Sequence, residues 1–254
     1  MPSQGARGRS ELSETDTLER AREEAARLRG SDEMEETFLQ AVSHDLRTPI
    51  AAILGLATTL EREDLELSPE DTRDMVSRIV ANARRLDRIV SDLLDLDRLS
   101  RGVTEPTLAR ADVGALVTRV VAESETGTER TVEVDAAPVE AVVDTVKVER
   151  IVENLLANAD RHAPGDSRIR VRVAADGEDA VIAVDDEGPA VPESDRERIF
   201  EPFRRGPAGR EHTLDVGVRL ALVAGFAELH GGRAWVQDGE DGGASFRVRL
   251  PLQP

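Results

Sequence analysis

The sequence predicts a chain of two parts: an antiparallel helical hairpin that dimerises into a four-helix bundle, followed by an α/β sandwich domain. Apolar residues recur every three or four positions over residues 32–100, which is typical of long amphipathic helices. From residue 131 on, short alternating apolar runs are interspersed with shorter helical patterns. Strands mixed with helices in this way favour a sheet covered by helices.

The hairpin is expected to consist of two helices, over about 32–62 and 69–100. Val42, Leu46 and Ile53 lie on the apolar stripe of the first helix. Ser68 and Pro69 mark the start of the second, because serine caps helix N-termini and proline is favoured at the first helical position. A single hairpin cannot bury both stripes. The chain is therefore expected to form a homodimer in which two hairpins make the bundle.

The second part is expected to mix helices and strands after a linker that begins near Gly102. A hairpin turn is expected at Asp176-Gly177, because glycine there tolerates a positive φ. The remaining elements follow from their periodicity: helices over 112–123, 146–161 and 215–230, and strands over 131–135, 141–143, 168–174, 180–184, 234–237 and 245–250.

Composition excludes several classes of function. The formal net charge of −18 argues against a general affinity for nucleic acid or for anionic membranes. The chain has no cysteine, so disulfides and thiolate metal sites are excluded, and its four histidines are scattered. No apolar run reaches the roughly 18 residues of a membrane helix, and the N-terminus lacks a signal-peptide core. A cytoplasmic protein with no membrane span is expected.

The first chemical motif is the heptapeptide at residues 43–49, Ser-His-Asp-Leu-Arg-Thr-Pro. His44 lies two residues from both Val42 and Leu46, roughly 200° from the apolar stripe, so its imidazole should face solvent. Asp45 can accept a hydrogen bond from one ring nitrogen and leave the other as a nucleophile. The alternative is that His44 is an ordinary surface histidine with no catalytic role.

This heptapeptide resembles the H-box of the HisKA class of histidine kinases. The resemblance implies that His44 takes the γ-phosphoryl group of ATP and that Asp45 acts as the general base or orienting acid. It also implies that Thr48 positions water when the kinase dephosphorylates its partner. An alternative for Thr48 is an ordinary residue of the helix surface.

A second motif, at residues 154–162, resembles the N-box of GHKL-type ATPase domains. Asn154 and Asn158 are four residues apart and lie on one helix face. The resemblance implies ATP binding, with Asn158 as the Mg²⁺ ligand and with Arg161 and His162 near the phosphates. A pair of polar helix residues is the alternative. Many hydrolytic relatives carry glutamate where this chain has Asn154, which suits transfer to histidine better than hydrolysis.

Two further boxes of the same family follow. Residues 186–192 resemble the G1 box, in which Asp186 accepts a hydrogen bond from the adenine amino group and Gly188 lets the backbone approach the nucleotide. Ala190 replaces the second glycine of that box. Residues 199–205 resemble the F-box, which implies that Phe200 and Phe203 anchor the lid over the site and that Arg204 and Arg205 approach the phosphates.

The glycine-rich loop departs from the family pattern. Family members usually carry three glycines whose amides cradle phosphate at a helix N-terminus. The segment at residues 215–220 keeps only Gly217; Asp215 adds a negative charge and Arg219 a positive one. Repulsion from Asp215 is expected to cost about 1 kcal/mol or more at close range, which Arg219 can offset.

Together these resemblances predict a two-component sensor histidine kinase. The expected domains are a polar tail with a short coiled-coil-like signalling helix over 1–31, a dimerisation and phosphotransfer domain over 32–102, and a catalytic ATP-binding domain over 103–254. The expected partner is the receiver domain of a response regulator. One alternative is a dimeric scaffold or phosphatase-biased binder with a degenerate ATP site; another is a GHKL serine kinase or hydrolytic ATPase.

Overall fold

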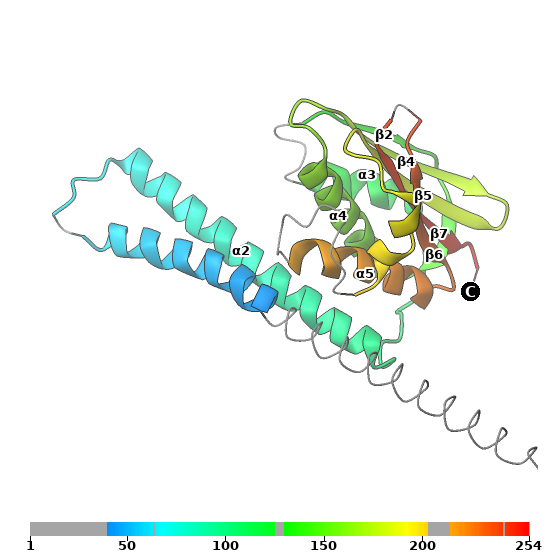
Figure 1. The fold of residues 1–254 in the computed structure, drawn as a ribbon, viewed down its shortest axis with the longest axis horizontal. Coiled ribbons are helices and arrows are strands. Elements are labelled where there is room, and N and C mark those ends of the chain that lie inside the picture. Colours follow the sequence, from blue (N-terminus) through cyan, green and yellow to red (C-terminus); the bar gives the residue numbers. More distant parts are fainter. Residues whose placement is uncertain (1–39, 63, 125–129, 203–213, 241, 254) are drawn as a thin grey trace, which may run out of the picture. The chain divides into compact units, whose positions relative to one another are not determined.

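The structure, a computed structural model, describes residues 40–62, 64–124, 130–202, 214–240 and 242–253 (Figure 1). The chain divides into two compact units, residues 1–44 and 45–254. The tail and coiled coil expected over 1–31, and the start of the first helix, lie outside the described residues.

The hairpin helices agree with the sequence-based expectation. Residues 40–60 are helical, and α2 spans Pro69–Ser100. The hydroxyl of Ser68 accepts from the Asp71 N–H at 3.0 Å, while the Ser68 N–H donates to the Asp71 carboxylate at 3.3 Å. This reciprocal capping box fixes the start of α2. Gly102 ends the helix with a φ of 62°, a conformation that glycine adopts without strain.

The hairpin leaves large apolar side chains open to solvent. The stripe expected on the first helix is half-buried, but Val76 and Val90 of the stripe expected on the second helix are exposed. Other apolar residues of the hairpin are exposed as well: Leu54 is 65 % exposed and Leu94 53 %, and Ile50 and Val80 belong to the same set. An apolar surface of this kind on a monomer marks an interaction site. The fold class, a helical N-terminal region followed by an α/β sheet domain, agrees with the prediction.

The second part contains two sheets. The smaller pairs β1 (Ala109–Asp112) antiparallel with β3 (Glu140–Val143). The larger has the order β2-β4-β5-β7-β6, with β2 parallel to β4 and every other pair antiparallel. Its strands are β2 (Val132–Ala136), β4 (Ile169–Asp176), β5 (Asp179–Asp186), β7 (Ala244–Pro251) and β6 (Arg233–Asp238).

Three helices cover one face of the larger sheet: α3 (Val113–Glu123), α4 (Thr145–His162) and α5 (Leu214–Leu229) (Figure 1). Alternate residues of the strands point toward them, so the core forms between these two layers. The largest fully buried side chains lie in this layer and include Ile151, Leu155, Ile169, Ile182, Leu222, Phe226 and Leu250.

One buried histidine connects the end of α5 to the start of α4. The Asp144 N–H donates to Nε2 of His230 at 2.9 Å, and Nδ1 of His230 lies 2.7 Å from the Phe226 carbonyl. Since Nε2 accepts, Nδ1 carries the proton and donates to that carbonyl. The carboxylate of Asp144 caps α4 through the Lys147 N–H and also accepts from the Thr107 N–H at 2.8 Å.

The last turns of α2 contact α4 and α5. Arg150 Nη2 donates to the Asp92 carboxylate at 2.5 Å, and Lys147 Nζ donates to Asp95 at 3.2 Å. Gly225 of α5 faces the side chain of Leu99, at a spacing too short for an added methyl group unless Leu99 moves. Within the described part of the chain, no helix combines the length and apolarity needed to cross a bilayer.

Candidate functional site

The H-box lies on the first hairpin helix, and its residues differ in exposure. His44 is exposed, as its position relative to the apolar stripe predicts, and so is Thr48. Asp45 is 3 % exposed, which the sequence did not indicate. The carboxylate of Asp45 is therefore shielded from water, whereas the ring of His44 remains accessible to an incoming group.

The N-box asparagines are buried on α4. Asn154 is 5 % and Asn158 4 % exposed, among the apolar residues that pack α4 on the sheet. Nδ2 of Asn154 has no hydrogen-bond partner among the described residues. Buried amides are normally satisfied, so this atom indicates a group that binds here. Arg161 is half-buried and His162 exposed, in the last turn of the same helix.

The G1 box turns against the end of α4. Asp186, the last residue of β5, is 3 % exposed, and its Oδ1 accepts from the Gly188 N–H at 2.8 Å. Its Oδ2 has no hydrogen-bond partner among the described residues. A Cβ on Gly188 would come within 2.9 Å of the His162 carbonyl and 2.6 Å of Asp186 Oδ1. Close packing on α4 thus requires glycine at position 188, in addition to any approach of a nucleotide.

The environment of Asp186 favours its neutral form. Burial raises the pKa of Asp186 to about 6, and the backbone N–H groups of Gly188 and Ala244 oppose this rise. The neighbouring Asp185 raises the pKa further, and the positive charge of Arg130 lowers it. A carboxyl that is costly to ionise and has a free acceptor atom is suited to binding a hydrogen-bond donor.

A glycine that the sequence analysis did not single out also shapes this site. Gly243, in the turn between β6 and β7, has a φ of 74°, and a Cβ there would overlap the Asp186 carbonyl oxygen. The backbone of Gly243, just before β7, therefore packs directly against the backbone of Asp186. Its positive φ is typical of a hairpin turn, but its contact with the G1 box depends on the fold.

The remaining motifs are only partly described. Phe200 lies in a short 3-10 turn and packs edge-on against Phe246 of β7, with ring centroids 6.5 Å apart. Phe203, Arg204 and Arg205 lie outside the described residues. In α5, Gly217 is buried and Arg219 half-buried; both are near the N-terminus of that helix.

The fold thus brings the N-box and the G1 box together at the C-terminal end of α4. Asp186, whose Oδ2 lacks a partner among the described residues, lies at that end. Asn154, whose Nδ2 also lacks one, lies about two turns earlier on the same helix.

Comparisons with known families agree with this geometry. A family model described as "Histidine kinase-, DNA gyrase B-, and HSP90-like ATPase" matches residues 143–254. A second, "His Kinase A (phospho-acceptor) domain", matches residues 34–102. The chain belongs to the histidine kinases. The pattern of motifs in the sequence, from the H-box to the N-box, predicted this family.

Several curated sensor kinases resemble this histidine kinase chain over most of its length. Sensor protein KdpD of Mycobacterium tuberculosis is 37 % identical over 227 residues, which cover 87 % of this chain and 26 % of KdpD. Sensor histidine kinase TmoS of Ectopseudomonas mendocina is 37 % identical over 234 residues, covering 89 % of this chain and 24 % of TmoS. The chain thus spans about a quarter of these relatives.

Solved histidine kinase structures share the fold. A mycobacterial sensor histidine kinase, MprB, superposes with a TM-score of 0.52 at 27 % identity and covers 57 % of this chain and 99 % of its own. ShkA, in a full-length complex with AMPPNP, has a TM-score of 0.58 at 26 % identity and covers 84 % of this chain and 45 % of its own. The HATPase domain supports ATP binding by this histidine kinase chain.

A magnesium ion fits the N-box by its chemistry. The amide oxygen of Asn158 is a hard ligand, and Mg²⁺ often takes one or two protein ligands while water and phosphates complete its shell. Among the residues that the structure describes, no group of three or more His, Cys, Asp or Glu side chains is arranged to hold a metal by itself. An ion held through Asn158 would need water and phosphate oxygens to complete its shell.

Proposed function

We propose that the chain is the catalytic core of a two-component sensor histidine kinase. It would bind ATP beside α4, transfer the γ-phosphoryl group to His44, and pass that group to an aspartate of a response regulator receiver domain. The observation that carries this proposal is the buried carboxylate of Asp186, which has a free acceptor oxygen and lies against the N-box helix. An exposed His44 in a complete H-box supplies the acceptor.

The transfer consists of two displacements at phosphorus. A ring nitrogen of His44 attacks the γ-phosphorus, so a P–N bond forms while the P–O bond to ADP breaks. The imidazole then loses a proton, and the Asp45 carboxylate orients the ring or takes that proton. In the second step the free ring nitrogen takes a proton back, from Asp45 or from water, and an aspartate oxygen of the partner attacks the phosphorus. The P–N bond then breaks and the neutral imidazole leaves. Such reactions require positioning and charge neutralisation more than covalent assistance.

The proposed nucleotide contacts follow the motifs. Asp186 Oδ2 accepts from the adenine amino group, and Gly188 keeps the turn against the base. Asn158 holds Mg²⁺, which neutralises phosphate charge when it is bound. Arg161, His162, Gly217 and Arg219 are proposed to lie along the phosphates. Asn154 cannot act as a strong base, so the site is suited to transfer rather than to hydrolysis.

The proposed working unit is a homodimer in the cytoplasm. The exposed apolar residues of the hairpin, among them Leu54 and Leu94, would be buried when two hairpins form the four-helix bundle. The proposed division is a signalling segment over 1–31, a dimerisation and phosphotransfer domain over 32–102, and an ATP-binding domain over 103–254.

Autophosphorylation tests the proposal directly. The purified chain is incubated with γ-labelled ATP and Mg²⁺ beside His44→Gln, and the label is tested for acid lability. Acid-labile label is expected on the parent and none on His44→Gln, which should bind ATP as the parent does. Acid-stable label, or equal label on both chains, would show that His44 is not the acceptor.

The glycine loop favours a second candidate, a phosphatase-biased scaffold. Only Gly217 remains of the three family glycines, and Arg219 stands in place of another. In that case Thr48 would position water for dephosphorylation of the partner while ATP binding is weak. Calorimetry with ATP distinguishes the two: the kinase requires binding below millimolar concentration, whereas the scaffold does not. Dephosphorylation of a phosphorylated regulator that is lost in Thr48→Ala would support the second candidate.

A further inference from the structure

Arg130 lies outside every motif, yet it makes a dense set of contacts at the nucleotide site. It lies two residues before the start of β2, and its side chain is 10 % exposed. Its guanidinium donates five hydrogen bonds, all to the segment that ends α4. A guanidinium has five N–H donors, so every donor is used.

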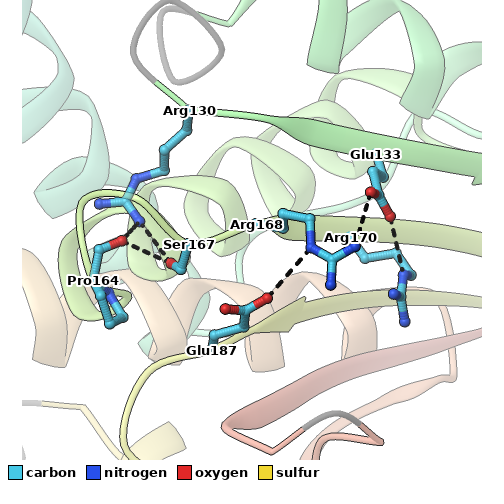
Figure 2. Close-up of polar contacts among 7 residues, drawn as sticks. All are labelled: Arg130, Glu133, Pro164, Ser167, Arg168, Arg170 and Glu187. Atoms are coloured by element: carbon cyan, nitrogen blue, oxygen red, sulfur yellow. Dashed lines mark hydrogen bonds and ion pairs between the residues drawn. The ribbon is translucent and has the colours of Figure 1, made fainter.

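The acceptors lie on the last turn of α4 and just after it. Nη2 donates to the carbonyls of Asp160 and Ala163 at 3.0 and 3.1 Å, and Nε donates to the Asp160 carboxylate at 2.9 Å. Nη1 donates to the carbonyl of Pro164 at 2.5 Å and to Oγ of Ser167 (Figure 2). The last carbonyls of a helix lack partners within it and carry partial negative charge. Arg130 supplies both hydrogen bonds and charge there.

The end of α4 is also the surface on which the G1 box rests. A Cβ on Gly188 would approach the carbonyl of His162, one residue before Ala163. Gly188 in turn donates to Asp186 Oδ1. A shift of the last turn of α4 would therefore move Gly188 and reorient the Asp186 carboxylate.

We propose that Arg130 is a positioning residue of the nucleotide site, which clamps the end of α4 so that Gly188 and the Asp186 carboxylate stay where adenine can bind. This inference rests on the proposed binding of ATP. Arg130 would act indirectly: it holds the end of α4, on which the adenine-binding residues rest, and does not touch the nucleotide.

The charge of Arg130 provides an independent readout. Arg130 lowers the pKa of Asp186, against the effects of burial and of Asp185. The other ionisable groups nearby are Asp160, which accepts from Arg130, Asp185, which pairs with Arg172, Glu187, which pairs with Arg168, and the two residues that end α4, Arg161 and His162. Nucleotide affinity should fall at low pH as Asp186 is protonated, and this part of the pH profile is called the acid limb. A neutral residue at position 130 should move the acid limb to higher pH. Lysine at 130 keeps the charge but has only three donors and no planar fork.

The test uses the full chain, with ATP and ADP in the presence of Mg²⁺, titrated calorimetrically between pH 5 and 8. Arg130→Gln and Arg130→Lys are compared with the parent and with Arg168→Gln. Arg168 lies in the same region (Figure 2), but its ion pairs are to Glu133 and Glu187. Among the described residues it donates no hydrogen bond to a carbonyl of α4. It is therefore a matched control for loss of a nearby arginine.

Arg130→Gln is expected to raise the Kd by about tenfold, because Gly188 and the Asp186 carboxylate lose the support that holds them in place; tenfold corresponds to about 1.4 kcal/mol. The factor should be the same for ATP and ADP, because the effect is at the base, and the acid limb should shift upward. Arg130→Lys should weaken binding without that shift, and Arg168→Gln should change the Kd by less than about twofold.

A parent-like Kd and acid limb in a folded Arg130→Gln would overturn the inference. If that variant does not fold, a parent-like Kd in Arg130→Lys overturns it instead. A loss that is larger for ATP than for ADP would also overturn it, since it would place the effect at the phosphates. If the parent itself does not bind ATP, the proposed function and this inference fail together. If the parent binds ATP and the Arg130 variants bind it equally well, only this inference fails.

Discussion

The raised pKa of Asp186 predicts that replacing this residue stabilises the free protein in a defined pH window. The pKa is about 6 in the folded chain, against 3.8 for an ordinary aspartate. A carboxyl whose pKa is higher in the folded state stabilises the fold fully below pH 3.8. It loses that contribution as the pH rises through about 6.

The magnitude follows from that difference. At about 1.4 kcal/mol per pH unit, the ionisation of Asp186 costs the folded state about 3 kcal/mol by pH 7. Asp186→Asn keeps the acceptor for the Gly188 N–H but has no charge to bury. The free energy of unfolding of Asp186→Asn minus that of the parent should therefore rise by about 3 kcal/mol between pH 4 and pH 7. The variant should lose ATP binding, because its amide presents a donor to the adenine amino group.

Urea unfolding without nucleotide, at one protein concentration and at several pH values, measures this difference. Asp185→Asn is the control: Asp185 pairs with Arg172 at 2.8 Å, so its removal should destabilise the chain at pH 7, which is the opposite sign. A difference for Asp186→Asn that stays flat between pH 4 and 7 would refute the reasoning. In the parent, ATP affinity should fall about tenfold per pH unit below pH 6 as the acceptor is protonated.

Three further changes test the packing and capping of the fold, each by equilibrium unfolding. Ser68→Ala removes the reciprocal cap of α2 and should cost about 1 kcal/mol; an unchanged stability would mean that the cap contributes nothing. Gly232→Ala would place a Cβ against the Arg249 carbonyl and should cost about 3 kcal/mol or more, so a neutral result would contradict the close packing. Asp92→Ala leaves the largely buried Arg150 without its 2.5 Å acceptor and should cost about 2 kcal/mol, and an equal stability of parent and variant would argue against this contact.

Features governed by local rules were predictable from the sequence. The capping residue Ser68, the terminating Gly102 and the turn at Gly177 depend on neighbouring residues, and the structure contains all three as expected. The strand β1 was less predictable. Residues 109–111 were expected to belong to the linker that begins near Gly102, and Asp112 to the helix that follows it. These residues are extended because they pair with β3 some thirty residues later.

The parts of the site that depend on tertiary contacts were not predictable. Arg130 looks like any arginine before a strand, and its role appears only because residues 30 to 37 positions later fold back around it. Gly243 was visible as a turn glycine, but its support of Asp186 depends on the pairing of β5 with β7. The burial of Asp45 beside an exposed His44 likewise depends on packing around the helix. Helical periodicity alone could not indicate it.

The hydrogen bonds of His230 have a mechanical consequence. The nucleotide motifs lie at the C-terminal end of α4 and near the N-terminal end of α5, whereas Asp144 and His230 join these helices at their opposite ends. With both ring nitrogens engaged, that junction resists separation. Movement of the motif-bearing ends is therefore expected to be a rotation about His230, so that the helices behave as two arms of a hinge. The nucleotide site would then open by a change in the angle between α4 and α5, with the imidazole of His230 as the pivot at the far end from the phosphates.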